Sequence, residues 1–266
     1  MLRMLYTTIE RAIFQSQKIL AKYSARPLFF IPPSLLSEFS MNNRVRIEFW
    51  YFNDAGTTKK PTVFTTQMID KYLDMAQKRE TAHYGILDNW LMDALEKYPI
   101  EDTNCVVLGS NDPWFESVCI FYGAMITTIE YKPLMSEDPR IKVMTPSKYD
   151  KKPQQFDCAV SISSFEHDGL GRYGDPINPN ADLETMHKMK RMVKPGGLLF
   201  LAVPIGTDIC VWNAHRVYGR LRFPLLIEGW EIVDTFGFSE DLFDKLTVGS
   251  GEHSNYTQPL FVLRNK

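Results

Sequence analysis

Residues 183–204 read LETMHKMKRMVKPGGLLFLAVP, a helical pattern that runs through a proline and two glycines directly into an apolar segment. Acidic Asp182 and Glu184 stand where the helix would begin and basic Lys190 stands near its end, which is the arrangement that the helix dipole favours. Pro195 and the two glycines after it cannot continue a helix. The stretch therefore predicts a helix that turns at once into a buried strand, the repeating unit of an α/β sheet.

The same alternation of short apolar segments and helical segments extends on both sides of this stretch, from residue 104 to residue 264. Strands separated by helices in this way predict a doubly wound, mainly parallel sheet with helices on both faces. Ligands of such sheets bind beyond the carboxyl ends of the strands, where the strand order reverses. We expect strands within 105–109, 124–131, 140–145, 156–163, 197–204, 230–238 and 258–264, and helices over 113–122, 183–193 and 215–227.

The first hundred residues lack this alternation. The spacing of apolar residues predicts an amphipathic helix at the start of the chain, a strand or edge hairpin over 45–53, and helices within 61–80 and 84–98. We therefore expect residues 1–100 to form a mostly helical extension or cap, and residues 101–266 to form the α/β domain.

Composition and charge narrow the classes of function. With 30 basic and 32 acidic residues the net charge is −2, which does not favour a nucleic-acid partner. The four cysteines lie far apart, without the spacing of metal ligands or of a disulfide framework, so we expect buried thiols and no metal site. No apolar segment of the sequence reaches the ~18 residues of a transmembrane helix.

The N-terminal segment leaves several interpretations open. Residues 1–30 carry five basic residues against one acidic residue. An amphipathic basic segment is typical of an ordinary packing helix with a solvated face, but also of a transit peptide or a helix on a membrane surface. We expect a cytoplasmic protein, and the sequence leaves its oligomeric state open.

The segment CVVLGSNDPW, residues 105–114, breaks from a strand into a polar turn of the kind that opens many nucleoside-cofactor sites. Gly109 permits a tight turn and a close approach of the backbone, and Asn111 is the next best residue for a left-handed backbone. Asp112 is placed to cap the following helix, whose N-terminus would favour a carboxylate or phosphate. We take Gly109, Asn111 and Asp112 as candidate cofactor-binding residues.

Glu130 ends the next apolar strand in the chain. It follows Gly109 by about 20 residues, the spacing at which an acidic residue holds a ribose diol in α/β nucleotide sites. A carboxylate suits this role because it accepts the protons of both hydroxyls. We favour ribose binding over the other interpretation, a surface glutamate at a strand end.

Titratable residues follow the strand within FDCAVSISSFEHDGLGRYGDP, residues 156–176. We take Ser163 as cofactor-binding, and Glu166 and His167 as catalytic; alternatively, Glu166 and His167 form a hydrogen-bonded pair that supports the loop. His215 is a second candidate base, because neutral imidazole titrates near the operating pH, or else a capping or partly buried histidine. We expect an acceptor pocket lined by arginine and aromatic side chains, which would suit a sugar or an acidic small molecule. The candidates for this lining are Arg172, Tyr173, Trp212, Arg216 and Tyr218.

The segments FDCAVSISSFEH and MVKPGGLLFLAVP together resemble the second half of class I S-adenosylmethionine-dependent methyltransferases, and the resemblance covers residues 104–264. With LGSNDPWFE, WNAHRVYG and QPLFVL, the chain further resembles an uncharacterised family, catalogued as a domain of unknown function, that is placed near these enzymes. The resemblance implies a seven-stranded sheet whose last strand is antiparallel. It also implies S-adenosylmethionine as the cofactor, with its methionine part near Gly109, its ribose on Glu130 and its sulfonium near residues 163–166.

The implied reaction is methyl transfer to a small molecule or glycan, with a hydroxyl as the expected acceptor, for which His167 or His215 would serve as base. The chain departs from the methyltransferase pattern at Val107, Asn111 and Pro113, where an acidic residue and two glycines are expected, and at Thr145, where an acidic residue often stands. A non-catalytic relative that binds or regulates is therefore the alternative. A nicotinamide-dependent oxidoreductase is disfavoured because GSNDPW lacks the G-x-G-x-x-G pattern.

Overall fold

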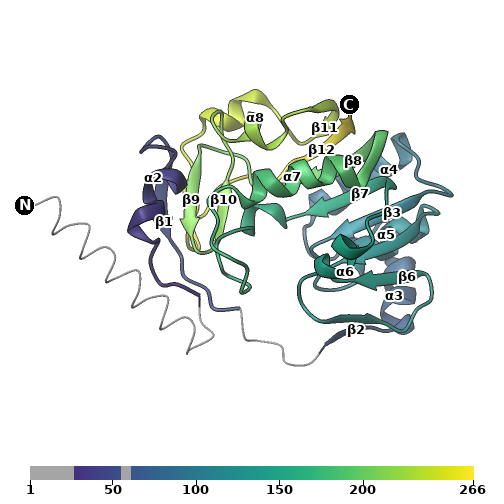
Figure 1. Ribbon diagram of the computed structural model, residues 1–266. Helices are drawn as coiled ribbons and strands as arrows, with labels where there is room; N and C mark the ends of the chain where they lie inside the picture. Colours follow the sequence, from purple (N-terminus) through teal and green to yellow (C-terminus); the bar gives the residue numbers. More distant parts are fainter. Residues whose placement is uncertain (1–26, 55–60) are drawn as a thin grey trace, which may run out of the picture.

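The computed structural model describes residues 27–54 and 61–266 of the chain. Its centre is a seven-stranded sheet in the order β11-β12-β8-β7-β3-β4-β6 (Figure 1). Strand β12 runs antiparallel to both of its neighbours, and the other pairings are parallel. The strands are β3 (Asn104–Leu108), β4 (Met125–Ile129), β6 (Ile141–Met144), β7 (Phe156–Ile162), β8 (Val193–Ala202), β11 (Trp230–Phe236) and β12 (Leu260–Asn265). The predicted α/β sheet with an antiparallel last strand is confirmed.

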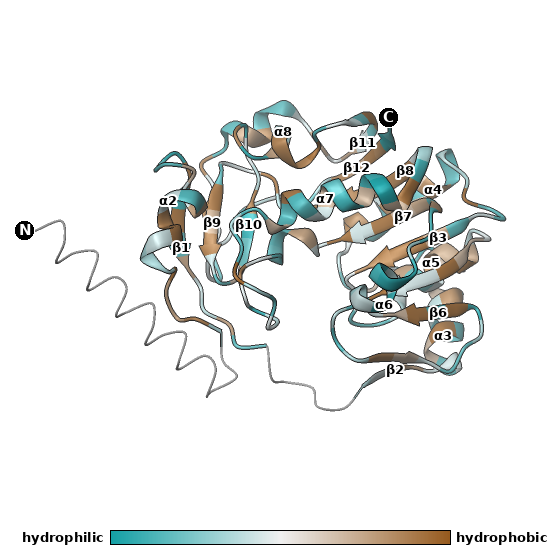
Figure 2. Ribbon diagram, viewed as in Figure 1, coloured by the Kyte–Doolittle hydropathy of each residue, from teal (hydrophilic) through white to brown (hydrophobic). Residues whose placement is uncertain are grey.

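Both faces of the sheet are buried, which explains why its strands are almost continuously apolar. Successive side chains of a strand point to opposite faces, so Val107 belongs to one core and Val106 to the other. In Figure 2 helix α7 is largely hydrophilic, whereas strands β6 and β9 are largely hydrophobic. The first face is covered by α3 (Thr66–Gln77), α4 (Ile86–Lys97) and α5 (Trp114–Phe121), and the second by α6 (Pro146–Lys151), α7 (Ala181–Met192) and α8 (Phe223–Leu226).

Helices α3 and α4 confirm the helices expected within 61–80 and 84–98, and they share a core with the sheet. The first of these segments begins, however, with the short strand β2 (Thr62–Phe64), which pairs in parallel with β5 (Leu134–Ser136). Thr65 then caps α3, because its side-chain oxygen accepts the N–H of Met68. The division of the chain at residue 100 stays a prediction.

A second sheet of three strands joins distant parts of the chain. It pairs β1 (Arg46–Phe49) in parallel with β9 (Ile209–Trp212), which forms an antiparallel hairpin with β10 (His215–Val217). The strand expected over 45–53 is confirmed. The helix expected over 215–227 is wrong, since β10 occupies its beginning and α8 spans only four residues. The remaining short elements are η1 (Pro33–Leu35), α2 (Leu36–Phe39), η2 (Phe165–His167) and η3 (Glu240–Asp244).

The helix expected over 215–227 does not form because two side chains at its start contact a residue of α7, which lies well before them in the sequence. The side chains of Arg216 and Tyr218 both reach the buried carboxylate of Asp182 in α7, at 3.7 and 3.0 Å. A strand places both residues, which are two positions apart, on the same face. The tertiary contact thus overrides the helical spacing of the apolar residues.

Two further expectations concern the N-terminal segment and the cysteines. The N-terminal amphipathic helix falls on residues 1–26, outside the described residues. Within residues 27–54 and 61–266 no helix combines the length and the hydropathy needed to cross a bilayer. All four cysteines are free and buried, and the apolar segments around Cys105, Cys119 and Cys158 predicted this for three of them.

Candidate functional site

A cavity of about 570 Å³ opens beyond the carboxyl ends of β3, β4 and β7. It is bordered by the first residues after each strand, Gly109, Glu130 and Ser163. Strand β3 lies between β7 and β4, so the chain reverses its direction across the sheet at this point, which is where α/β sheets bind their ligands. The volume falls within the range of small-molecule sites.

The segment that follows β3, residues 109–113, is called the β3 loop below. Gly109 has a φ of 74°, and a Cβ added there would lie 2.1 Å from the Oγ of Ser164. The close contact that requires a glycine at position 109 is therefore made by Ser164 of the same chain. Asn111 lines the cavity, and its side-chain oxygen accepts a hydrogen bond from Lys132 Nζ at 3.3 Å.

Asp112 does not line the cavity. One of its carboxylate oxygens accepts the N–H of Trp114, the first residue of α5, at 3.1 Å, but the N-cap of that helix is Pro113 rather than the expected Asp112. The other oxygen lies 2.8 Å from Nε2 of His83. Trp114 is fully buried in the core on the α3 and α5 side of the sheet, so its ring leaves the cavity open.

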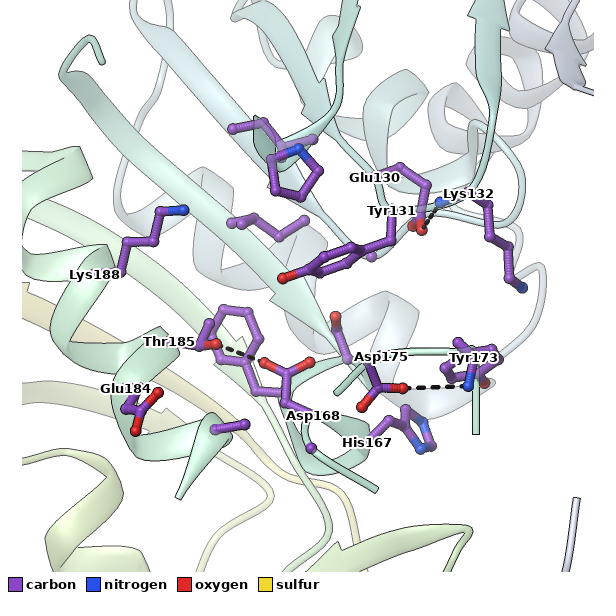
Figure 3. Close-up of a pocket in the computed structure, with 18 of the residues that line it drawn as sticks. Glu130, Tyr131, Lys132, His167, Asp168, Tyr173, Asp175, Glu184, Thr185 and Lys188 are labelled. Atoms are coloured by element: carbon purple, nitrogen blue, oxygen red, sulfur yellow. Dashed lines mark hydrogen bonds between the residues drawn. The ribbon is translucent and has the colours of Figure 1, made fainter. Parts of the chain in front are cut away.

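Glu130 faces the cavity with both carboxylate oxygens held by the backbone (Figure 3). Its Oε2 accepts the N–H of Ser110 at 3.0 Å and its Oε1 accepts the N–H of Lys132 at 2.9 Å. A carboxylate oxygen accepts two hydrogen bonds, so each oxygen retains one acceptor position. The turns after β3 and β4 are thereby joined, and the carboxylate keeps the capacity to accept two hydroxyl protons.

The segment that follows β7, residues 163–168, is called the β7 loop. It starts with Ser163 at a φ of 51°, a backbone conformation that non-glycine residues adopt mainly where surrounding contacts enforce it. Ser163 Oγ donates to Glu166 Oε1 at 2.8 Å, and Gln258 Nε2 donates to the same oxygen at 3.4 Å. Glu166 is 1% exposed, lies outside the cavity lining, and burial raises its pKa to about 7.

The two histidines differ in their access to the cavity. His167 lines it, and its Nδ1 lies 2.6 Å from the carbonyl oxygen of Ala214. A carbonyl can only accept, so Nδ1 carries the proton and Nε2 presents a lone pair. Burial lowers the pKa of His167 to about 3 and that of His215 to about 4. His215 lies outside the cavity lining and packs against the rings of Tyr256 and Trp50.

Asp168 is a cavity residue that the list of candidates from sequence leaves out. Its carboxylate points into the cavity in Figure 3, and one oxygen accepts the hydroxyl of Thr185 in α7 at 2.6 Å. Burial raises its pKa to about 7, although the Thr185 hydrogen bond acts in the opposite direction. The sequence pattern that could have identified Asp168 is its position two residues after Glu166, just beyond the end of a buried strand. Other cavity residues not expected from sequence are Tyr131, Lys132, Glu184 and Lys188.

Of the residues expected around a methyl acceptor, Tyr173 lines the cavity. Arg172 does not, and its guanidinium pairs with Asp54 at 2.7 Å. Trp212, Arg216 and Tyr218 do not line it either. These three are buried in the protein interior, and that expectation is wrong for them. Arg216 donates to the backbone oxygen of Asp168 at 2.6 Å and so supports the β7 loop from behind. Burial alone would raise the pKa of Asp182, but Arg216 and Arg222 hold it below its usual range.

Fold and cavity together define a Rossmann-like α/β protein with a cavity at the topological switch point, where such folds bind their ligands. The chain belongs to the family described as "Caenorhabditis protein of unknown function, DUF268", whose model matches residues 102–265. This confirms the resemblance to a family of unknown function. Across residues 27–54 and 61–266, no three His, Cys, Asp or Glu side chains are arranged to hold a metal ion.

Three solved structures illustrate the similarity of fold. A candidate hemolysin of Streptococcus thermophilus is 15% identical, with 66% of this chain and 64% of that chain covered and a TM-score of 0.42. The 1,6-didemethyltoxoflavin-N1-methyltransferase of Burkholderia thailandensis, solved with S-adenosylhomocysteine, is 11% identical, with 74% and 87% covered and a TM-score of 0.48. TehB from Haemophilus influenzae is 14% identical, with 72% and 66% covered and a TM-score of 0.43.

The chain spans 64% of the length of the hemolysin structure. A search of curated proteins found no match.

Proposed function

We propose that the protein is an S-adenosylmethionine-dependent methyltransferase that acts on a hydroxyl group of a small molecule or glycan. The observation that supports this best is the carboxylate of Glu130. It stands at the end of the second strand of the sheet, faces the cavity at the switch point, and retains one acceptor position on each oxygen. Two adjacent acceptors match the two hydroxyls of a ribose.

The residues around the cavity fit the proposed cofactor. Glu130 would hold the ribose, and Ser163 and Asn111 would face the methionine part, where Lys132 supplies a positive charge for its carboxylate. The adenine would lie against the apolar part of the lining, which comes from Ile129, Tyr149, Phe165 and Met189. When bound, the cofactor supplies a methyl group that its sulfonium has already activated for transfer.

The chain itself would orient the acceptor and remove its proton. His167 Nε2, whose lone pair is fixed by the Ala214 hydrogen bond, would accept a hydrogen bond from the hydroxyl and aim its oxygen. Because the pKa of His167 is about 3, its imidazole is neutral near pH 7 and is a weak base for a second proton. Asp168, with a pKa of about 7, is better matched to take the proton near neutral pH. Orientation alone can supply roughly 7–11 kcal/mol of the barrier.

The test is calorimetry with S-adenosylhomocysteine on the wild type and two charge-reversed variants. We expect Glu130→Lys to abolish measurable heat, because it removes both acceptors and adds a cation. Glu137→Lys is the matched control: Glu137 is exposed, lies outside the cavity lining, and makes the same change of charge. Thermal melting of both variants separates loss of binding from loss of folding. Retained affinity in a folded Glu130→Lys protein would overturn the proposal.

The alternative is a non-catalytic relative that uses the cavity for binding or regulation. The observation in its favour is the β3 loop, in which Gly109 is closed off by Ser164 and Asp112 is turned away from the cavity. Incubation with methyl-labelled S-adenosylmethionine and a mixture of sugars, glycans and small alcohols distinguishes the two. Binding without label transfer to any acceptor would favour the non-catalytic protein.

A further inference from the structure

Four aromatic side chains form an exposed patch on the protein surface, far from the cavity residues in sequence. Phe29, Phe30 and Phe49 are 58%, 53% and 58% exposed. Their rings contact one another and Tyr51, with centroids 4.8 to 6.3 Å apart. We call these four residues the aromatic patch. Single exposed apolar residues are ordinary, but a contiguous group marks an interaction surface.

The patch lies on an edge of the fold. Phe49 ends β1, which is an outer strand of the three-stranded sheet, and Phe29 and Phe30 lie at a bend in the segment before η1. Tyr51 is tied to that segment because its hydroxyl donates to the carbonyl of Pro27 at 3.0 Å. The rings are thus presented by backbone that is hydrogen-bonded in place.

The sequence directly before the patch points to the kind of partner. Residues 1–26 contain five basic residues and a single acidic residue, Glu10. Apolar residues recur among them at helical spacing, the pattern of segments that lie at a membrane interface. Clustered basic residues are attracted to anionic lipids, and aromatic rings partition into the headgroup region.

We propose that the aromatic patch docks the protein on an anionic phospholipid surface. The charge of residues 1–26 favours lipid over a second copy of the chain, because a symmetric dimer through this patch would bring two basic segments together. The lipid contact is independent of the proposed methyl transfer, since no residue of the patch lines the cavity.

The first test is cosedimentation of the full chain with vesicles. We expect binding to phosphatidylcholine vesicles that contain about 30% phosphatidylserine, weakened by salt, and little binding to phosphatidylcholine alone. The triple variant Phe29→Ser, Phe30→Ser, Phe49→Ser should bind at least about tenfold more weakly. The matched control changes three exposed apolar residues elsewhere, Ile86→Ser, Ile232→Ser and Leu246→Ser, and should bind as the wild type does. Equal binding by both triple variants, or no binding by the wild type, would overturn the proposal.

The second test asks what covers the patch. A Phe49→Cys variant is labelled with a maleimide, against a low background because all four native cysteines are buried. Labelling should be fast in buffer and slowed several-fold by the anionic vesicles, whereas Leu246→Cys should be labelled equally fast with and without them. Slow labelling of Phe49→Cys in buffer would mean that the chain itself, or a second copy seen as a dimer by sedimentation, covers the patch, and lipid docking would be wrong.

Discussion

The β3 loop and the β7 loop border the same cavity, but they use their polar groups differently. In the β3 loop, Gly109 packs on Ser164 and Asp112 bonds to the start of α5 and to His83. In the β7 loop, the side chains of His167 and Asp168 line the cavity, Nε2 of His167 lies 3.8 Å from Oε1 of Glu166, and burial shifts the pKa of both cavity residues. The β3 loop thus shapes the cavity through its backbone, whereas the β7 loop would supply the side chains for the proposed chemistry.

This difference explains how the β3 loop can lack the further glycines of the methyltransferase pattern. A glycine-rich turn is needed where a ligand approaches the backbone, but here the close approach at Gly109 comes from Ser164. In the proposed function the ligand contact would fall instead to Glu130, whose carboxylate is positioned by two backbone N–H groups. The comparison therefore predicts that binding depends on Glu130, and that turnover depends on the β7 loop.

The largest effect is expected from removing the charge of Asp168. Asp168→Asn should lower label transfer from S-adenosylmethionine to the acceptor mixture by about 10²–10⁴-fold, the range for loss of a general base. In the wild type the rate should rise with pH through about 7, because the pKa of Asp168 is about 7 and only the ionised form accepts a proton. The variant should lose this rise. Rates measured from pH 5 to 9 test both statements.

Asp175→Asn is the matched control for this prediction. Asp175 also lines the cavity, but its oxygens accept the N–H groups of Gly171 and Tyr173. Asp175→Asn should therefore disturb the segment 171–175 but leave the increase of the rate near pH 7 unchanged. A rise that persists in Asp168→Asn and vanishes in Asp175→Asn would move the base to a different residue.

The next effect concerns the contact between the two loops. Gly109→Ala should destabilise the fold by about 2–4 kcal/mol, because it combines a left-handed backbone with a steric overlap on Ser164. Adding Ser164→Gly should relieve the overlap and leave about 1 kcal/mol from the backbone alone. Gly196→Ala serves as control, since Gly196 has a φ of 79° and nothing within 4 Å of an added Cβ. Denaturant unfolding of the wild type, Gly109→Ala, Ser164→Gly and the double variant measures the coupling, with Gly196→Ala beside them, and simple additivity would show that the loops do not support each other.

The fold and the ligand edge could be predicted because both follow from short-range patterns. The helix–glycine–strand stretch fixed the sheet, and the spacing of Glu130 from Gly109 led to a carboxylate that does line the cavity. The burial of Arg216 and Tyr218 could not be predicted, because it depends on Asp182 in α7. That of His215 depends on the rings of Trp50 and Tyr256, which are equally remote in the sequence. Whether a polar side chain enters the cavity or the core is decided by partners that are remote in the sequence.

The last comparison concerns two buried acids, one in the helix that follows the β3 loop and one within the β7 loop. Glu116 in α5 and Glu166 in the β7 loop are both almost fully buried, and burial raises the pKa of each from 4.5 to about 7. Below pH 4.5 a carboxyl of this kind is protonated in the folded and unfolded chain alike. Between pH 4.5 and 7 the unfolded chain ionises first, so stability falls as the pH rises.

Glu166→Gln should remove this loss at one site, because the amide stays neutral at every pH. Relative to the variant, the wild type should lose up to about 3 kcal/mol of unfolding free energy between pH 4.5 and 7.5. Glu116 is present in both proteins, so the difference between their unfolding curves isolates Glu166. If the difference is flat over this range, the carboxylate of Glu166 is ionised in the folded protein, and the β7 loop holds a fixed charge rather than a neutral acid beside His167.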